Sequence, residues 1–244
     1  MMCRKVAISF RSEEELTLHF RPSPSIRACL HALRPGQHLC LFYDHMEEQI
    51  GITIEFIRGG LEHDERCLYV SDSDTVAKLR EALHQSSLGA REALARRAIV
   101  LLPKEQAYLA GGRFDVEGML TMLEAAVDSA LTDGFTGLRA AGDMTWLLDE
   151  APGSERAVEY EAMMNEFYKN SRALGLCLYD RQRLHPTALE SALRTHPRVL
   201  IGDQCCGENP YYESPDVFFK RVDPRERFNW RLRQLRDRTM AQPE

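Results

Sequence analysis

The segment GQHLCLFYDHMEEQIG, residues 36–51, contains the pattern that decides the fold class. Its apolar run at 38–43 is short and typical of a buried strand, and apolar residues at three- and four-residue spacing follow from Ile50 to Leu61. Parallel strands are joined by helices that carry the chain back across the sheet. The segment therefore predicts one unit of a parallel sheet.

The same alternation of strand and helix patterns continues to residue 206. Further apolar runs predict strands at 66–72, 98–103, 137–146, 175–184 and 198–204. Helical spacing at 76–83 and 119–127 follows Asp74 and Asp115, which we expect to be N-caps. Near-continuous apolar strands separated by helices are typical of a sheet covered on both faces. The sequence therefore predicts a doubly wound, mostly parallel α/β domain with six strands.

This domain is expected at 35–212, with a different kind of segment on each side of it. Residues 1–34 are predicted to be an N-terminal extension and linker, and 213–244 a basic C-terminal tail. Within the extension we expect an edge strand at 6–10, a linker at 21–25 and a short helix at 26–33.

The tail is basic although the whole chain is not. Residues 221–238 hold seven Arg against three acidic residues, whereas the net charge of the chain is −6. Direct nucleic-acid binding is not expected, because it requires clustered Lys and Arg over a broad surface. An amphipathic helix is predicted in the tail, and its apolar side chains are candidates for binding a signalling protein or a second copy of the chain: Phe228, Trp230, Leu232 and Leu235.

Composition places the chain among ordinary globular proteins. Its 244 residues are 44% apolar and 28% charged, and no run approaches the length of a membrane span. The first twenty residues lack the apolar block of a signal peptide, since Glu13 to Glu15 lie where it would be. The seven Cys are an odd number at irregular spacing, which favours reduced thiols. We therefore expect a cytoplasmic protein.

The loop after the first predicted strand argues against nucleotide hydrolysis. A phosphate-binding loop would read GxxxxGK[ST], with backbone N–H groups and a Lys around the phosphates. Here the loop reads YDHMEEQIG, and Asp44, Glu47 and Glu48 put negative charge where phosphate would lie. A Walker-type site is therefore not predicted.

In open α/β sheets ligands bind beyond the carboxyl ends of the strands. The candidate ligand-binding residues chosen on this basis are His38, Tyr43, Asp44, Asp72, Arg113, Asp143, Trp146, Tyr179 and Asp180. Structural roles remain open for several of them. Asp143 suits a turn anchor, Arg113 a salt bridge, and Trp146 either a pocket wall or the core.

The sequence does not favour a metal-binding or redox function for its Cys and His residues. His38 and Cys40 could share a soft metal with His45 or Cys67, but a buried donor and a small apolar thiol account for them, so no metal is predicted. The adjacent pair Cys205-Cys206 is not expected to be redox-active.

Catalytic motifs do not emerge from the sequence. It contains no nucleophile elbow, no HExxH and no GxGxxG. Glu159 and Glu161 lie on a predicted helix, where one carboxylate is expected to pair with Arg139 or Arg181 rather than act as an acid or base. We predict neither an enzyme nor a cofactor.

Several blocks in order from Gly36 to about Tyr212 resemble the MEDS family, the sensory domain of methanogen proteins and of the dichloromethane-dehalogenase regulator. The blocks are GQHLCLFYD at 36–44, FIRGGLEHDERCLYVSDS at 56–73, YLAGGRFD at 108–115, GLRAAGDMTW at 137–146, EYEAMMNEF at 159–167, LCLYDR at 176–181, HPRVLIG at 196–202 and NPYY at 209–212. The resemblance implies a RecA/KaiC-like core that lacks the nucleotide-hydrolysing loop.

The resemblance also implies a function in sensing. Members of the family are proposed to bind small hydrocarbon derivatives and often carry an output module, such as a DNA-binding domain in a transcription regulator. The leading hypothesis is a non-catalytic sensor that binds a small organic ligand and signals through a protein partner or through self-association. The alternatives are a nucleotide-binding KaiC-like protein with an unorthodox loop and a protein-interaction module that acts through its C-terminal helix.

Overall fold

The computed structural model describes residues 20–219, and these form an α/β domain around a seven-stranded sheet. The strand order is β3-β2-β4-β5-β1-β6-β7. Neighbours from β3 to β6 pair in parallel, and β7 pairs antiparallel with β6. The strands are β1 His38–Tyr43, β2 Arg66–Ser71, β3 Ile99–Pro103, β4 Leu138–Asp143, β5 Ala173–Asp180, β6 Arg198–Ile201 and β7 Gln204–Glu208. The predicted fold class is confirmed.

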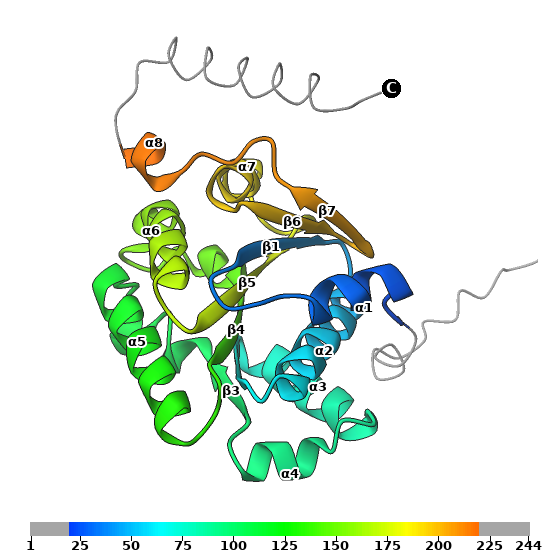
Figure 1. Ribbon diagram of the computed structural model, residues 1–244. Coiled ribbons are helices and arrows are strands. Elements are labelled where there is room, and N and C mark those ends of the chain that lie inside the picture. The colour runs from blue at the N-terminus through cyan, green and yellow to red at the C-terminus, as the bar shows by residue number, and fades with distance from the viewer. Residues whose placement is uncertain (1–19, 220–244) are drawn as a thin grey trace, which may run out of the picture.

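Helices cover both faces of this sheet (Figure 1). On the first face lie α1 Pro24–His31, α2 Met46–Glu62, α3 Ser73–Gln85 and α4 Ala90–Ala95. On the second face lie α5 Val116–Thr132, α6 Ala157–Lys169 and α7 Pro186–Thr195. The remaining elements are α8 Pro215–Phe219 and the 3-10 turns η2 Lys104–Gln106, η3 Ala110–Gly112, η4 Met144–Asp149 and η5 Ser154–Arg156.

Strand alternation divides the core into two layers. Along β1, Leu39 and Leu41 point into the first-face core, whereas Cys40 and Phe42 point into the second-face core. All six residues of β1 are buried, as expected for a central strand between two helical layers. A side chain's position along a strand therefore tells which helices it meets.

The structure corrects several boundaries of the sequence prediction. The expected strand at 175–184 ends at Asp180, and the expected strand at 198–204 ends at Ile201. Strand β7 was not predicted, because QCCGE carries no apolar run. The expected strand at 137–146 ends at Asp143, whose side chain accepts a hydrogen bond from the Thr145 amide and starts η4. The N-cap of α3 is Asp72 rather than Asp74, and its carboxylate accepts from the amide of the third residue beyond it.

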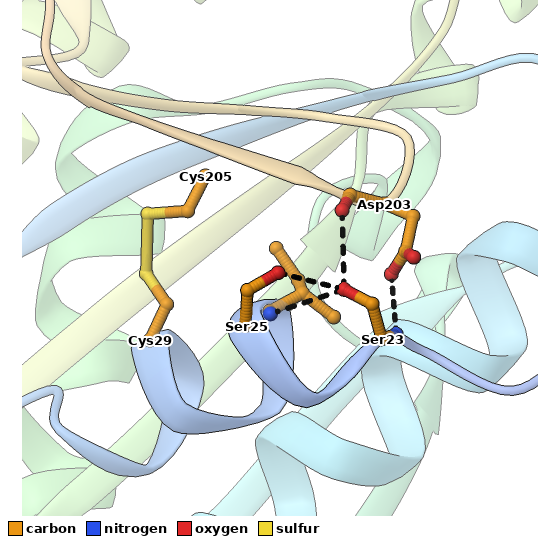
Figure 2. The surroundings of a disulfide bond; sticks show 6 residues. Ser23, Ser25, Cys29, Asp203 and Cys205 are labelled. Atoms are coloured by element: carbon orange, nitrogen blue, oxygen red, sulfur yellow. Dashed lines mark hydrogen bonds between the residues drawn. A yellow bond between two sulfur atoms is a disulfide. The ribbon is translucent and has the colours of Figure 1, made fainter.

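Helix α1 is attached to the far edge of the sheet (Figure 2). It begins at Pro24, inside the predicted linker, because Ser23 acts as its N-cap. The Ser23 amide donates to Asp203 Oδ1 at 2.7 Å, and Cys29 forms a disulfide with Cys205 of β7. The expectation of reduced thiols is therefore wrong for this pair. A separation of 176 residues hid the pairing from a reading of local spacing.

Two predicted segments lie outside the described residues. These are the edge strand at 6–10 and the tail helix with Phe228, Trp230, Leu232 and Leu235. Among the helices that the structure does describe, none has the length and apolar character needed to cross a bilayer.

Candidate functional site

The loop after β1 is occupied by the chain's own side chains. The Asp44 amide donates to Glu48 Oε2 at 2.9 Å, so a carboxylate lies at the start of α2. The Asp44 carboxylate contacts the Arg181 guanidinium and accepts from Gln182 Nε2 at 2.9 Å. These hydrogen bonds, led by the one from Arg181, lower the pKa of Asp44. The loop therefore presents carboxylates rather than free N–H groups, which does not suit a phosphate.

A closed hydrogen-bond network fills the space beyond β2 and β4, and we call Gln49, Tyr69, Ser71 and Asp143 the Asp143 network. Gln49 Nε2 donates to Tyr69 Oη at 3.0 Å and to Asp143 Oδ2 at 3.1 Å. Ser71 Oγ donates to the same carboxylate oxygen at 2.8 Å. Burial raises the pKa of Asp143, although these donors oppose the shift. Both carboxylate oxygens accept hydrogen bonds, so the network is complete as it stands.

Four other predicted ligand residues, Tyr43, Asp72, Arg113 and Asp180, do not line the pocket described below. Asp72 caps α3, and Asp180 accepts from two backbone amides of the turn that follows β5. Tyr43 is buried against the first-face core, where burial raises its pKa. Arg113 is exposed and forms none of the ion pairs found within residues 20–219, so its expected salt bridge is absent there.

Trp146 belongs to an aromatic cluster in the second-face core. Its ring stacks on Tyr108 with centroids 5.1 Å apart and lies 4.5 Å from the ring of Phe114. Only 1% of Trp146 is exposed. Of the two roles predicted for this residue, core packing is the one that the contacts favour.

A pocket of about 410 Å³ opens on the second face, between η4, α6 and α7, and we call it the α6–α7 pocket. Among the predicted ligand-binding residues, Tyr179 alone lines it. Its walls include Met144, Leu147, Val158 and Ala188, and Glu161 contributes a carboxylate. Side chains close the ends of β1 and β4, and this pocket lies over β5.

Next to this pocket four buried side chains meet, and we call His38, Glu161, Cys177 and His196 the Glu161 cluster. They come from the start of β1, from α6, from the middle of β5 and from the α7–β6 connection. Glu161 Oε2 lies 3.4 Å from His38 Nε2, 3.2 Å from His196 Nε2 and 3.5 Å from Cys177 Sγ. His38 Nε2 lies 3.4 Å from Cys177 Sγ.

Hydrogen bonds on the outer side of the cluster fix the tautomer of each imidazole. His196 Nδ1 lies 2.8 Å from the carbonyl oxygen of Ala192, so this nitrogen carries the proton. His38 Nδ1 lies 3.2 Å from Asn165 Oδ1, and the Asn165 amide group donates to three backbone carbonyls. Asn165 therefore presents its oxygen to His38. The Nε2 atom of each imidazole therefore faces Glu161.

The protonation states leave the cluster rich in electron pairs. Burial lowers the pKa of His38 to about 4, so this imidazole is neutral near pH 7. Five buried side-chain atoms of the described residues lack a hydrogen-bond partner, and two of them, His196 Nε2 and Glu161 Oε1, lie in this cluster; the others are His31 Nε2, Thr53 Oγ1 and Trp146 Nε1. Such atoms are rare in folded proteins and call for an explanation.

The sequence prediction found one member of this cluster and missed three. Neither Cys67 nor His45 accompanies His38, and Glu161 pairs with neither Arg139 nor Arg181. Arg139 is bound to Glu65, Arg181 to Asp44, and Glu159 to Arg156. One signal was present: Glu161, Asn165 and Tyr168 occupy the buried stripe of α6, where a carboxylate is unusual.

Fold and site together define a parallel α/β domain that has a ligand-sized pocket but no phosphate-binding loop. A model of the MEDS family, the MEthanogen/methylotroph, DcmR Sensory domain, matches residues 37–197. The chain belongs to this family of sensory domains.

Comparison with solved structures and with curated proteins adds little to this assignment. The chain is similar to a KaiC-like protein from the hyperthermophilic archaeon Pyrococcus horikoshii OT3, with 11% identity and a TM-score of 0.48. The alignment covers 68% of this chain and 71% of that one. No curated protein matches the sequence.

Proposed function

We propose that this chain is a non-catalytic sensor that binds a small organic molecule in the α6–α7 pocket and reports its presence to a protein partner or through self-association. Membership of a sensory-domain family supports the general role. The ligand class that we propose, a small hydrocarbon derivative, follows from the family resemblance and from the character of the pocket walls.

The pocket is the observation that carries the proposal. Its volume of about 410 Å³ falls within the range of small-molecule sites, roughly 300–1,000 Å³. Apolar side chains such as Leu147 and Val158 form part of its walls. Polar and acidic side chains form the rest: Glu150, Ser154, Glu155, Glu161, Tyr179, His185, Thr187, Ser191 and Thr195. Apolar walls combined with hydroxyl groups favour a compact organic ligand that carries a polar group, and the carboxylates of the lining disfavour the phosphates of a nucleotide.

A route for the signal runs from the pocket to the end of the described chain. Ala188, Ser191 and Thr195 of α7 line the pocket. On the same helix, Arg194 forms an ion pair with Glu213 at 2.9 Å, and its guanidinium lies over the Phe218 ring of α8. We propose that a ligand which displaces α7 alters the attachment of α8 to it.

A pair of tryptophan substitutions tests the pocket. Ala188→Trp fills it, whereas Ala125→Trp adds the same side chain to an exposed position of α5. The full chain and both variants are heated with a panel of short-chain alcohols, aldehydes, carboxylates and chloroalkanes, and with an ATP analogue plus magnesium. Bound ligand at about a hundred times its Kd stabilises the fold by about 2.7 kcal/mol.

We expect at least one organic compound to raise the Tm of the wild type and of Ala125→Trp by several degrees, but not that of Ala188→Trp. The proposal fails if every organic compound leaves the wild type unchanged. It also fails if the ATP analogue alone stabilises the protein, or if the shift is the same in Ala188→Trp.

A further inference from the structure

The electron pairs of the Glu161 cluster converge on one buried point. His38 Nε2, His196 Nε2 and a Glu161 oxygen face one another, and the Cys177 thiol is the single weak donor among them. Lone pairs that face lone pairs in a dry core are costly, and in proteins a positive charge between them removes that cost. We propose that His38, Glu161, Cys177 and His196 bind one divalent transition-metal ion of the Zn²⁺ type. This site goes beyond the proposed function and does not depend on it.

The distances between the four side chains suit tetrahedral coordination. Zinc binds nitrogen and oxygen at about 2.0–2.2 Å and sulfur at about 2.3 Å, so neighbouring ligand atoms in a tetrahedron lie roughly 3.3–3.8 Å apart. The separations around Glu161 Oε2 are 3.2, 3.4 and 3.5 Å, and His38 Nε2 lies 3.4 Å from Cys177 Sγ. All four ligand atoms lie within 4.8 Å of one another.

The groups behind the two histidines match those that surround metal-binding imidazoles. Such histidines donate their second N–H to a carbonyl or carboxylate, which fixes the tautomer and aims the lone pair at the metal. Here the carbonyl of Ala192 and the side-chain oxygen of Asn165 accept those protons. Asn165 is itself held by the carbonyls of Glu161, Ala162 and Thr195.

Charge and ligand type select the ion. The Glu161 carboxylate, a Cys177 thiolate and two neutral imidazoles carry two negative charges, so a divalent ion leaves the buried site neutral. The Cys177 thiol releases its proton to water when the ion binds, because the thiolate is the form that coordinates a metal. Two nitrogens, one oxygen and one sulfur suit Zn²⁺ or Co²⁺ and do not suit Mg²⁺ or Ca²⁺.

Such an ion would join four separate parts of the second face. It would tie α6 and the α7–β6 connection to strands β1 and β5. Glu161 also lines the α6–α7 pocket, so the ion lies directly behind a pocket wall. Four protein ligands make a closed site, which is typical of metals that hold a fold together rather than of metals that activate water.

Cobalt and zinc binding to the full chain test the site. The protein is stripped with a chelator and titrated with Co²⁺, then with Zn²⁺, while absorption spectra, native mass spectra and thermal unfolding are recorded. We expect one ion per chain, the intense visible bands of four-coordinate Co²⁺, a thiolate-to-cobalt charge-transfer band in the near ultraviolet, and a higher Tm with Zn²⁺.

Matched Cys→Ser variants identify the sulfur ligand. Cys177→Ser should lose the charge-transfer band and weaken Zn²⁺ binding by more than about tenfold. Loss of a residue that only hydrogen-bonds to a metal ligand already lowers metal affinity by about that factor. Cys67→Ser changes an equally buried thiol on the first face and should leave both unchanged. Absence of one-to-one binding, a cobalt spectrum without a thiolate band in the wild type, or equal affinity in Cys177→Ser would each overturn the proposal. The wild-type spectrum decides the question even if Cys177→Ser does not fold.

Discussion

The buried charged groups of β4 on the first face of the sheet and the Glu161 cluster on the second face differ in how their polar atoms are satisfied. On the first face, Arg139 and Asp143 project from β4 towards α2, and their charged atoms are matched by partners. Arg139 donates to Glu65 at 2.6 Å and to the carbonyls of Leu30, Leu33 and Phe56. On the second face, the Glu161 cluster leaves His196 Nε2 and Glu161 Oε1 buried without hydrogen bonds. Elsewhere on the first face, Thr53 Oγ1 and His31 Nε2 are also buried without a hydrogen-bond partner.

This difference separates architecture from function. A buried polar group that is fully hydrogen-bonded explains its own presence, because its partners repay much of the lost hydration. A buried group without a partner remains costly unless an ion, a proton or a ligand joins it. Arg139 and Asp143, whose charged atoms are matched, therefore belong to the scaffold, whereas the Glu161 cluster beside its pocket is the part that we propose binds something.

The largest loss of stability is expected when the guanidinium of Arg139, which donates hydrogen bonds to four oxygen atoms, is removed. Arg139 is completely buried, so Arg139→Leu leaves the Glu65 carboxylate without its counter-ion in the core. Loss of one partner of a buried pair costs about 3–5 kcal/mol. Urea unfolding of the variant measures this loss. Arg156→Leu, which removes an exposed guanidinium bound to Glu117 and Glu159, should have little effect. Equal losses of stability in the two variants would contradict the structural role that we assign to Arg139.

A smaller loss of stability is expected when two hydrogen-bond acceptors are made to face each other in the Asp143 network, as they do in the Glu161 cluster. Gln49→Glu replaces an amide donor, 3.1 Å from Asp143 Oδ2, with a second carboxylate. The variant should be less stable at pH 7 by about 1–3 kcal/mol, because acceptors then face acceptors in a buried network. In the matched control, Gln85→Glu also places a carboxylate beside another one, Glu81, but at an exposed position, and should change little.

The pH dependence of Gln49→Glu gives a second check with a definite sign. Burial already raises the pKa of Asp143, and a second carboxylate raises it further. A carboxyl group whose pKa is higher in the folded than in the unfolded state favours folding at low pH, and this contribution disappears as the pH rises through the folded-state value. The deficit of the variant should therefore shrink as the pH is lowered from 7 towards about 4. A deficit that grows on acidification would contradict this account.

The sheet could be predicted from sequence because each strand carries its own signal. The apolar runs at 38–43, 66–72 and 98–103 correspond to β1, β2 and β3 within a residue at either end. The absence of a phosphate-binding loop could also be predicted from one short stretch of sequence, since Asp44 and Glu48 lie within five residues of each other. Strand β7 could not be predicted from sequence, because its pairing with β6, and not its composition, makes it a strand.

The Glu161 cluster could not be predicted in the same way, because it exists only after four distant segments pack together. His38 opens β1 and Cys177 lies in the middle of β5, whereas candidates were chosen at the carboxyl ends of strands. The rule that ligands bind at those ends led to the Asp143 network, which proved to be closed. Only the packing of α6 and α7 on the second face shows that His196 and Glu161 meet.

The smallest expected change in stability is also the one that separates the two faces most sharply. In metal-free protein, Glu161→Gln replaces a carboxylate that faces the Nε2 lone pairs with an amide that donates to one of them. Its stability should equal that of the wild type or exceed it by up to about 1 kcal/mol, and added Zn²⁺ should no longer stabilise it. Glu213→Gln is the matched control, because Glu213 is buried and accepts two hydrogen bonds from Arg194. That variant should lose about 1.5–3 kcal/mol, as expected for bonds to a charged group. Urea unfolding of both variants, with chelator and with Zn²⁺, measures these differences. If Glu161→Gln loses as much as Glu213→Gln without metal, Glu161 is already satisfied by its neighbours, and the contrast between the two faces disappears.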